Sequence, residues 1–288
     1  MTAIYKREVR SYFNSMIGYV FVAVVAAFIG IFFMLVNLKS GAPYFSYTLS
    51  SIVIIFVFSV PMITMKSMAE ERRMKTDQML LTYPVKVSSI VVGKYLAMVT
   101  VFLIPMLISL LCPLVINFYG EGSFLIDFSS IFAVFCLGCM FVAIGMFVSS
   151  LTESQVISAI GTMGALLLLM LWSSLVNYIP NTAIGSLIGF FILLGMVLAV
   201  LYRMTQGKIL TLIVGVIGAA LLGGCYLIDS SVFAGLLPRV LSIFSVLKVI
   251  DNFSVYHVFD VRGLILILSV AALFAFLTVQ VVQRRRWS

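Results

Sequence analysis

The sequence predicts an all-α integral membrane protein with about eight transmembrane helices. Hydrophobic residues make up 63% of its 288 residues and charged residues only 10%, whereas soluble proteins average roughly 45–50% and about 25%. The mean hydropathy is +1.22. Apolar runs close to the ~20 residues that cross ~30 Å of hydrocarbon recur along the whole chain. We also expect an N-terminal amphipathic interfacial helix and a re-entrant or interfacial outer segment before the last span.

Eight apolar runs are long enough to be spans, and none of them contains Asp, Glu, Lys, Arg or His. The expected spans are Met16–Leu38, Thr48–Met65, Tyr95–Asn117, Phe128–Ser149, Val156–Val176, Ile184–Tyr202, Ile209–Ile228 and Gly263–Val282.

The basic residues predict the orientation, because cytoplasmic loops carry an excess of Lys and Arg. With both termini in the cytoplasm, only four of the 18 basic residues fall outside, namely Lys39, Arg239, Lys248 and Arg262. The apolar segment Ser231–Ile250 is a possible ninth span. Pro238 interrupts it, and an extra crossing would place the C-terminal arginines outside. We therefore expect a re-entrant or interfacial helix pair within residues 229–260.

Residues 1–15 have the pattern of an amphipathic helix lying along the inner leaflet. Its cationic side carries Lys6, Arg7 and Arg10. Its apolar side consists of Ile4, Tyr5, Val9, Tyr12 and Phe13.

The longest cytoplasmic connection, residues 66–94, predicts two short helices. The first covers Ala69–Thr82 and is stopped before Pro84, because proline disfavours α conformation in the preceding residue. The second begins after Ser88 as N-cap and leads into the next span. The turn Leu151–Gln155 is a second, much shorter inner connection. A solvated charged loop without a partner is the alternative interpretation of residues 66–94.

Composition disfavours several other functions. The net charge of +8 comes from cations between apolar runs, not from a basic stripe with aromatics, so we expect no nucleic-acid partner. Cys112, Cys136, Cys139 and Cys225 all lie in apolar runs, where thiols usually pack. No metal site is expected.

Two kinds of membrane protein with their own chemistry are also disfavoured. Ion-coupled carriers usually hold an ionisable residue within a span. An intramembrane metalloprotease needs about three ligands together, but His257 is the single histidine and is expected on the opposite side from Glu70 and Glu71. No GxxxxGK[ST] loop occurs in the sequence. Nucleotide energy must therefore come from a separate subunit.

Three stretches form the most specific pattern in the sequence. The first runs from Ala69-Glu70-Glu71-Arg72-Arg73 through Thr76-Asp77-Gln78-Met79-Leu80-Leu81-Thr82-Tyr83-Pro84-Val85 to Val92-Gly93-Lys94-Tyr95-Leu96-Ala97. The second is Ser149-Ser150-Leu151-Thr152-Glu153-Ser154-Gln155, and the third is the last span with Arg284-Arg285-Arg286-Trp287. They resemble the ABC-2 type (type V exporter-like) ABC transporter permeases, in particular the gliding-motility-associated branch. The chain differs from that pattern at Lys75, where glycine is usual, and at Gln78, where glutamate is usual.

The resemblance implies one ABC-2 type transmembrane domain over residues 1–288, a non-catalytic permease subunit of an exporter in a prokaryotic inner or plasma membrane. It implies a second permease half, identical or different, and two cytosolic ABC ATPase subunits that bind the ATP and Mg²⁺; no cofactor is expected in this chain. By match, the ATPase-coupling residues are Glu70, Glu71, Arg72, Arg73, Thr76, Asp77, Gln78, Leu81, Tyr83 and Pro84, with Leu151, Thr152, Glu153 and Gln155 in the second element.

Uncharged spans also suggest the type of cargo. An amphipathic, lipid-like or peptide substrate suits a lining of hydroxyl groups better than an ion does. The alternative is a membrane anchor that transmits force to an auxiliary membrane protein with a large outer domain, docked on residues 229–260, without flux. The predicted pathway residues are Ser50, Ser51, Ser59, Ser158, Thr162, Ser173 and Ser174.

Overall fold

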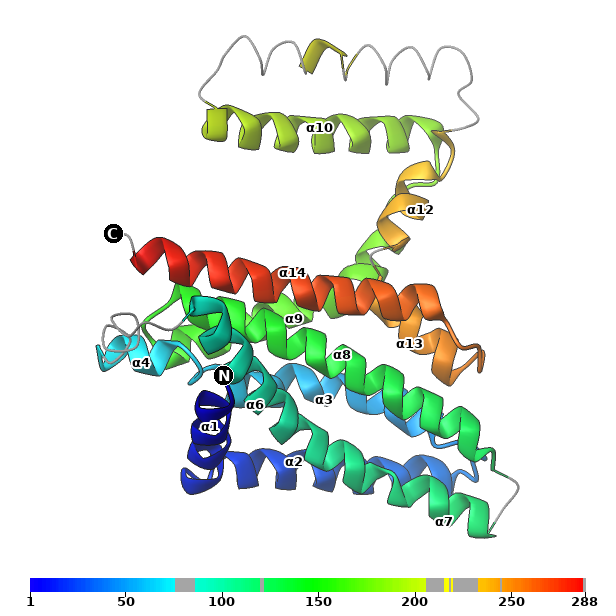
Figure 1. Ribbon diagram of the computed structural model, residues 1–288. Coiled ribbons are helices and arrows are strands. Elements are labelled where there is room, and N and C mark those ends of the chain that lie inside the picture. Colours follow the sequence, from blue (N-terminus) through cyan, green and yellow to red (C-terminus); the bar gives the residue numbers. More distant parts are fainter. Residues whose placement is uncertain are drawn as a thin grey trace. The chain divides into compact units, whose positions relative to one another are not determined.

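The computed structural model describes residues 1–75, 86–119, 122–205, 215–217, 219, 233–243 and 245–286, and its regular elements there are helices. Figure 1 shows them in chain order from blue to red. The helices are α1 (Thr2–Asn14), α2 (Ile17–Phe32), the π-helical η1 (Phe33–Lys39), α3 (Ser46–Thr64), α4 (Ala69–Arg73), α6 (Val87–Ser109), α7 (Leu111–Tyr119), α8 (Phe124–Leu151), α9 (Gln155–Asn177), α10 (Ala183–Thr205), α12 (Leu236–Ile243), α13 (Val246–Ser254) and α14 (Val261–Arg286).

Six helical stretches of the described chain are long and apolar enough to cross a membrane, and they confirm an all-α integral membrane fold. Each coincides with one of the predicted spans; they are Ile17–Lys39, Ser46–Arg73, Val87–Tyr119, Phe124–Leu151, Gln155–Asn177 and Val261–Arg284. The sixth predicted span, Ile184–Tyr202, corresponds to the helix α10, of which Ala183–Met196 is apolar. The seventh, Ile209–Ile228, lies outside the described residues except for helical residues at 215–217 and 219.

The chain divides into two compact units. One contains Met1–Met170 and Val246–Ser288, and the other contains Leu171–Ser245. In the smaller unit, α10 packs on α12, with Gly189 against the side chain of Leu237. The indole of Trp172 donates a hydrogen bond of 2.9 Å to the carbonyl of Leu241. That these units act as one transmembrane domain stays a prediction.

Helix α8 forms the centre of the larger unit and contacts α3, α6, α13 and α14. Of its most apolar 18-residue window, 78% is buried, against 17% for α2 and for α14. Apolar side chains that face outward on α2 and α14 are what a bilayer-embedded bundle requires, since lipid solvates them. The ring of Phe102 on α6 lies in the core within 5.1 Å of the Phe56 ring centroid.

Two predicted helix boundaries in residues 66–94 are wrong. The first helix, α4, ends at Arg73, not at Thr82. The second helix is the start of α6 and leads into the span as predicted, but it begins at Val87 after an extended Lys86, so Ser88 is not its N-cap. Burial of Val87, Ile90 and Val91 against the bundle stabilises this early start more than a serine cap would.

Helices α6 and α8 begin before the spans that were predicted for them, and each therefore includes a buried ionisable residue. Lys94 on α6 and Asp127 on α8 are 2% and 0% exposed. One Asp127 oxygen accepts a hydrogen bond of 3.2 Å from the backbone N–H of Ser46, where α3 begins. The hydroxyl of Ser46 in turn donates to the carbonyl of Ser254, at the end of α13.

The segment before the last span contains two short helices, α12 and α13, which agrees with the predicted helix pair. One side of α13 buries Val246, Val249, Ile250 and Phe253 against α3, α8 and α14. Its placement in the membrane interface stays a prediction.

Asp260 precedes α14 and caps it. Its Oδ1 accepts a hydrogen bond of 3.0 Å from the N–H of Gly263, and its Oδ2 accepts one of 2.8 Å from Asn252 on α13. The hydrogen bond from Gly263, with smaller contributions from Asn252 and Arg262, lowers the pKa of Asp260 below its ordinary value. The charged cap therefore stabilises the fold most above about pH 4, the ordinary pKa of aspartate, and loses this effect as pH falls through the lowered value.

Replacing Asp260 by alanine is expected to destabilise the fold by about 1 kcal/mol, the usual cost of removing a helix cap. Thermal unfolding of the detergent-solubilised protein at neutral pH measures this. Asp260→Asn is the control, because asparagine caps helices well but does not titrate. An unfolding midpoint of Asp260→Ala equal to wild type would contradict the assignment.

Candidate functional site

Helix α4 is held at its N-terminus by a serine from the end of α8. The hydroxyl oxygen of Ser149 accepts hydrogen bonds from the backbone N–H groups of Met68 (3.2 Å) and Ala69 (3.1 Å), and the hydroxyl donates to the carbonyl of Met65 (3.3 Å). The first N–H groups of a helix have no partner within it. Ser149 supplies that partner from another element, so α4 is fixed to α8.

Arg72 makes a second connection between α4 and the end of α8. Its guanidinium donates to the carbonyl of Ser150 at 3.3 Å and forms an ion pair with Glu153 at 2.9 Å. Ser150 belongs to α8, and Glu153 lies in the turn between α8 and α9. The structure thus joins two segments about 80 positions apart in the sequence, the helix after α3 and the turn after α8.

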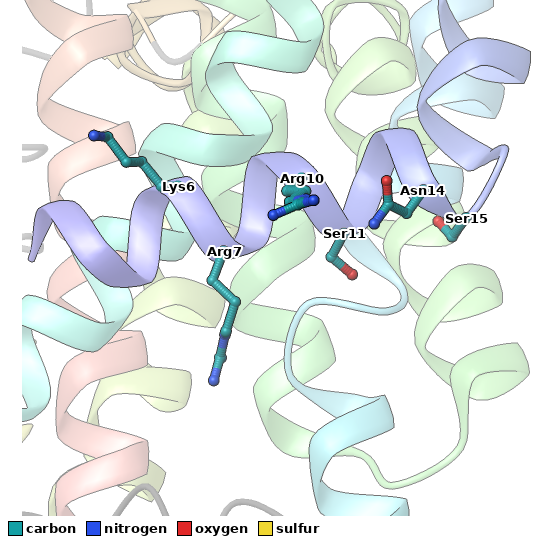
Figure 2. Close-up of a pocket in the computed structure, with 6 residues that line it drawn as sticks. All are labelled: Lys6, Arg7, Arg10, Ser11, Asn14 and Ser15. Carbon is teal, nitrogen blue, oxygen red and sulfur yellow. The ribbon is translucent and has the colours of Figure 1, made fainter.

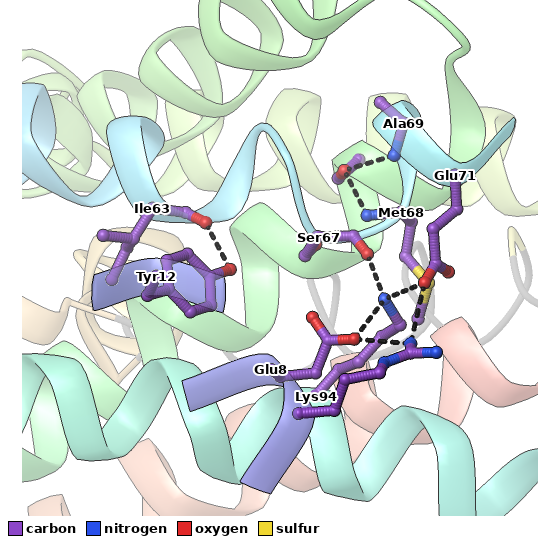
Figure 3. Close-up of polar contacts among 10 residues, drawn as sticks. Glu8, Tyr12, Ile63, Ser67, Met68, Ala69, Glu71 and Lys94 are labelled. Carbon is purple, nitrogen blue, oxygen red and sulfur yellow. Dashed lines mark hydrogen bonds and ion pairs between the residues drawn. The ribbon is translucent and has the colours of Figure 1, made fainter. Parts of the chain in front are cut away.

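A buried lysine joins three elements at the same end of the bundle. The Nζ of Lys94 lies 2.8 Å from Glu71 Oε1 and 3.4 Å from Glu8 Oε1, and it donates to the carbonyl of Ser67 at 2.8 Å. Figure 3 shows these contacts converging on the ammonium group. Arg7 also pairs with both carboxylates, at 2.7 Å and 3.2 Å. We call Arg7, Glu8, Glu71 and Lys94 the charge cluster.

The apolar side of α1 packs on protein, mainly on α6 and α2, where the sequence predicted contact with the leaflet. The buried Tyr12 hydroxyl donates to the carbonyl of Ile63 at 2.8 Å, and burial raises the pKa of this phenol, so it remains a donor. Gly93 on α6 lies against Ile4, and a Cβ there would be 3.3 Å from it. Helix α1 is therefore a fixed part of the bundle.

A polar cavity of about 310 Å³ lies beside the charge cluster. The hydrogen bond to Glu8, together with both carboxylate charges, raises the pKa of Arg7, so this cation stays charged. The cavity is lined by Arg7, Glu8, Ser11, Tyr12, Ser15, Lys66, Ser67, Glu70, Glu71 and Lys94.

The sequence that forms these spans and inner connections matches a known protein family. The model of the family described as ABC-2 family transporter protein matches residues 2–188, about two thirds of the chain. The chain belongs to the ABC-2 transporter family. It is the membrane permease subunit of an ABC transporter. Proteins of this family are embedded in the bilayer and work with an ABC ATPase. No curated protein sequence matches it at a significant level.

The structure of the permease brings together some of the residues predicted to contact the ATPase. Arg72 and Glu153 are paired, and Glu71 is engaged by Lys94 and Arg7. Arg73 is exposed at the end of α4, as is Leu151 at the end of α8. The predicted coupling residues Thr76, Asp77, Gln78, Leu81, Tyr83 and Pro84 lie outside the described residues.

Lys75, which departs from the expected family pattern, has an unusual backbone conformation. Its φ is +57°, in the left-handed region that glycine enters at no steric cost and other residues enter rarely. The glycine expected at this position would adopt the observed turn after α4 without strain.

The predicted pathway residues of the permease make no hydrogen bond between α3 and α9 in the described part of the chain. Ser50 and Ser51 donate to backbone carbonyls of their own helix. The hydroxyls of Ser59, Ser158 and Thr162 are buried without a partner among the described residues. A role in a pathway stays a prediction for all seven residues.

Lys94, Glu8, Tyr12 and Ser149 were not among the residues predicted for the candidate site, although the structure places them there. Lys94 lies in the matched stretch Gly93-Lys94-Tyr95, but the sequence placed it at the inner end of a loop, and its burial depends on α1. No group of three or more His, Cys, Asp or Glu in the described ranges could hold a metal ion. Cys136 and Cys139 are buried on α8 as free thiols.

Proposed function

We propose that the permease is the exporter subunit of the gliding-motility-associated ABC-2 branch, and that the linked pair of α4 and the α8–α9 turn receives the force of the ATPase. The Arg72–Glu153 ion pair together with Ser149 carries this proposal. A coupling site must move spans together, and these contacts connect the segment after α3 to the segment between α8 and α9.

In the proposed complex, two cytosolic ABC ATPases bind ATP and Mg²⁺ and contact this linked pair, and a second permease half completes the pathway. Both termini and the linked pair lie on the cytoplasmic side of a prokaryotic inner membrane. Rigid-body motion of packed elements is a common way to transmit such a change. The short α4 is suited to it because both α8 and Lys94 hold it in place.

A charge exchange tests the coupling site. Arg72→Glu should reduce the stimulation of the partner ATPase's hydrolysis several-fold, because the new carboxylate repels Glu153, and Glu153→Arg alone should do the same. The double variant Arg72→Glu/Glu153→Arg should recover most of the stimulation. The readout is ATP hydrolysis by the complete complex reconstituted in liposomes.

Lys66→Gln is the matched control. Lys66 pairs with Glu70 at 3.9 Å within the same segment but does not reach the α8–α9 turn, so stimulation should be unchanged. The Glu153 end of the pair is 71% exposed, and ion pairs at the surface contribute about 0–1 kcal/mol to stability, so each variant should fold. Full stimulation in both single variants would exclude the linked pair as the coupling site.

For the cargo, we propose an amphipathic substrate that is lipid-like or a peptide. The support is the apolar outer surface of α9, where Val156, Ile160 and Leu168 are each more than 60% exposed, alongside the buried hydroxyls of Ser158 and Thr162. An amphipathic molecule could be accommodated by such a mixture of apolar and hydroxyl groups. A requirement for a small inorganic ion in transport assays would exclude this cargo class.

A second function, transmission of force to an outer protein without flux, is favoured by one observation. After α13, the aromatic and apolar side chains of Tyr256, Val258 and Phe259 are 69%, 58% and 55% exposed around an open cavity. They could dock an auxiliary protein. ATP-dependent movement of fluorescent amphipathic substrates in sealed vesicles distinguishes the two functions, because an anchor would hydrolyse ATP without flux.

A further inference from the structure

A broad, shallow depression lies on the surface of α1, lined by residues of this helix and by Ser15 just after it. It has a volume of about 610 Å³ and is lined by Lys6, Arg7, Arg10, Ser11, Asn14 and Ser15, without a carboxylate. Figure 2 shows Lys6 and Arg7 extending to either side of α1, with Arg10 between them and the polar residues continuing along the helix. We call these six residues the cationic face. Such a surface attracts an anion with several oxygen acceptors.

The cationic face lies next to the start of the first membrane span, α2. Helix α1 lies across the end of α2 (Figure 1), and α2 begins only three residues after α1 ends. The first exposed apolar side chains of α2 are Tyr19 and Val20, next to Met16, which is 75% exposed. Because an apolar span starts there, α1 lies at the depth of the lipid headgroups.

Two of the three cations on this face, Lys6 and Arg10, are not neutralised by the described part of the protein. Lys6 and Arg10 form no ion pair among the described residues, in contrast to Arg7. Since the apolar side of α1 is packed against α6 and α2, this helix exposes a mainly polar side. A free amphipathic helix would insert its apolar side into the membrane, but α1 can interact with lipid chiefly through its cations.

We propose that the cationic face binds the phosphate-bearing headgroup of an anionic phospholipid. Guanidinium groups bind phosphate oxygens with paired hydrogen bonds, so Arg10 would provide the main contact and Lys6 a second charge. Ser11 and Asn14 would hydrogen-bond the glycerol or headgroup oxygens. An acidic protein surface would need no proximity to the bilayer, whereas this face begins where α2 enters it, which favours a lipid.

Lipid binding would affect the proposed coupling site, because Arg7 belongs both to the cationic face and to the charge cluster. The charge cluster includes Glu71 of α4. A phosphate near Arg7 would compete with Glu8 and Glu71 for its donors. This consequence rests on the proposed function, whereas lipid binding itself does not.

The experiment measures thermal unfolding of the full-length chain in a neutral detergent during titration with short-chain phosphatidylglycerol or phosphatidylcholine. Wild type should show a saturable rise of the unfolding midpoint with phosphatidylglycerol only, because a ligand that binds the native state stabilises it. Lys6→Gln/Arg10→Gln should raise the half-saturating concentration about tenfold or more, since each cation contributes about 1 kcal/mol toward anionic lipid.

The control Lys39→Gln/Arg262→Gln removes the same charge from two exposed residues outside α1 and should titrate like wild type. An unchanged titration in Lys6→Gln/Arg10→Gln, or an equal response to phosphatidylcholine, would overturn the proposal. An equal response to inorganic phosphate at the same concentration would also overturn it and indicate a free-anion site. Loss of ATPase co-purification with unchanged lipid titration would assign the face to the ATPase instead.

Discussion

Replacing Lys94 by methionine is expected to destabilise the permease by about 3–5 kcal/mol, the usual cost of removing one partner of a buried ion pair. The ammonium group is 2% exposed and is shared by Glu71, Glu8 and the carbonyl of Ser67. Without it, the largely buried carboxylates of Glu8 and Glu71 would lose the cation that they share. The unfolding midpoint in detergent and the yield of monodisperse protein measure the effect.

Two variants separate this effect from a general loss of charge. Lys66→Met removes a cation from the same end of the bundle, but Lys66 is 29% exposed and pairs only at 3.9 Å, so its cost should stay below about 1 kcal/mol. Lys94→Met/Glu71→Gln should recover part of the lost stability because it also removes one of the two negative charges that Lys94 neutralises. A wild-type midpoint for Lys94→Met would refute the structural role of the charge cluster.

The second large effect is expected at Gly138 on α8. A Cβ there would collide with the aromatic ring of Phe102, and that ring is confined by Phe56, Phe21 and Phe135. Overpacking a dense core costs about 1–3 kcal/mol, and Gly138→Val should be at or above the upper limit. Thermal unfolding and the fraction of protein that aggregates on solubilisation report this result.

Gly164→Ala on α9 is the control, because nothing lies within 4 Å of a Cβ at that position. In a helix, alanine is favoured over glycine by roughly 0.5–1 kcal/mol, so this variant should be neutral or slightly stabilised. A second test is Gly138→Val with Phe102→Leu, where the smaller side chain should relieve part of the collision. If Gly138→Val unfolds like wild type, α6 and α8 do not pack as closely as described.

Much of the fold could be predicted because transmembrane helices depend on a local property. Each of the six long helices in the described ranges coincides with a run of apolar residues, and lipid imposes that length on any span. The predicted ends were less accurate. Helix α6 begins at Val87, next to the predicted cap Ser88 but before the predicted span start Tyr95. Burial of Val87 against its neighbours extends the helix, and hydropathy does not register packing between helices.

The candidate site was predicted only in part. The pattern around Glu70 to Arg73 and the turn at Glu153 pointed to two connections on one side of the membrane, but the sequence could not show that Arg72 binds Glu153. Lys94 looked like a topology signal, one of many basic residues near a span. Its burial requires α1 to cover it, and this contact joins residues 8 and 94.

The amino-acid sequence by itself determined that this protein spans a membrane, roughly where it does so, and that it resembles ABC-2 permeases, since apolar length and motif order are local features. Tertiary structure alone decided which charges are buried, that Ser149 caps α4, and that the apolar side of α1 packs on protein. Those features depend on helices distant in sequence meeting at one end of the bundle. Burial and ion pairing depend on the contacts between these helices, not on any single segment.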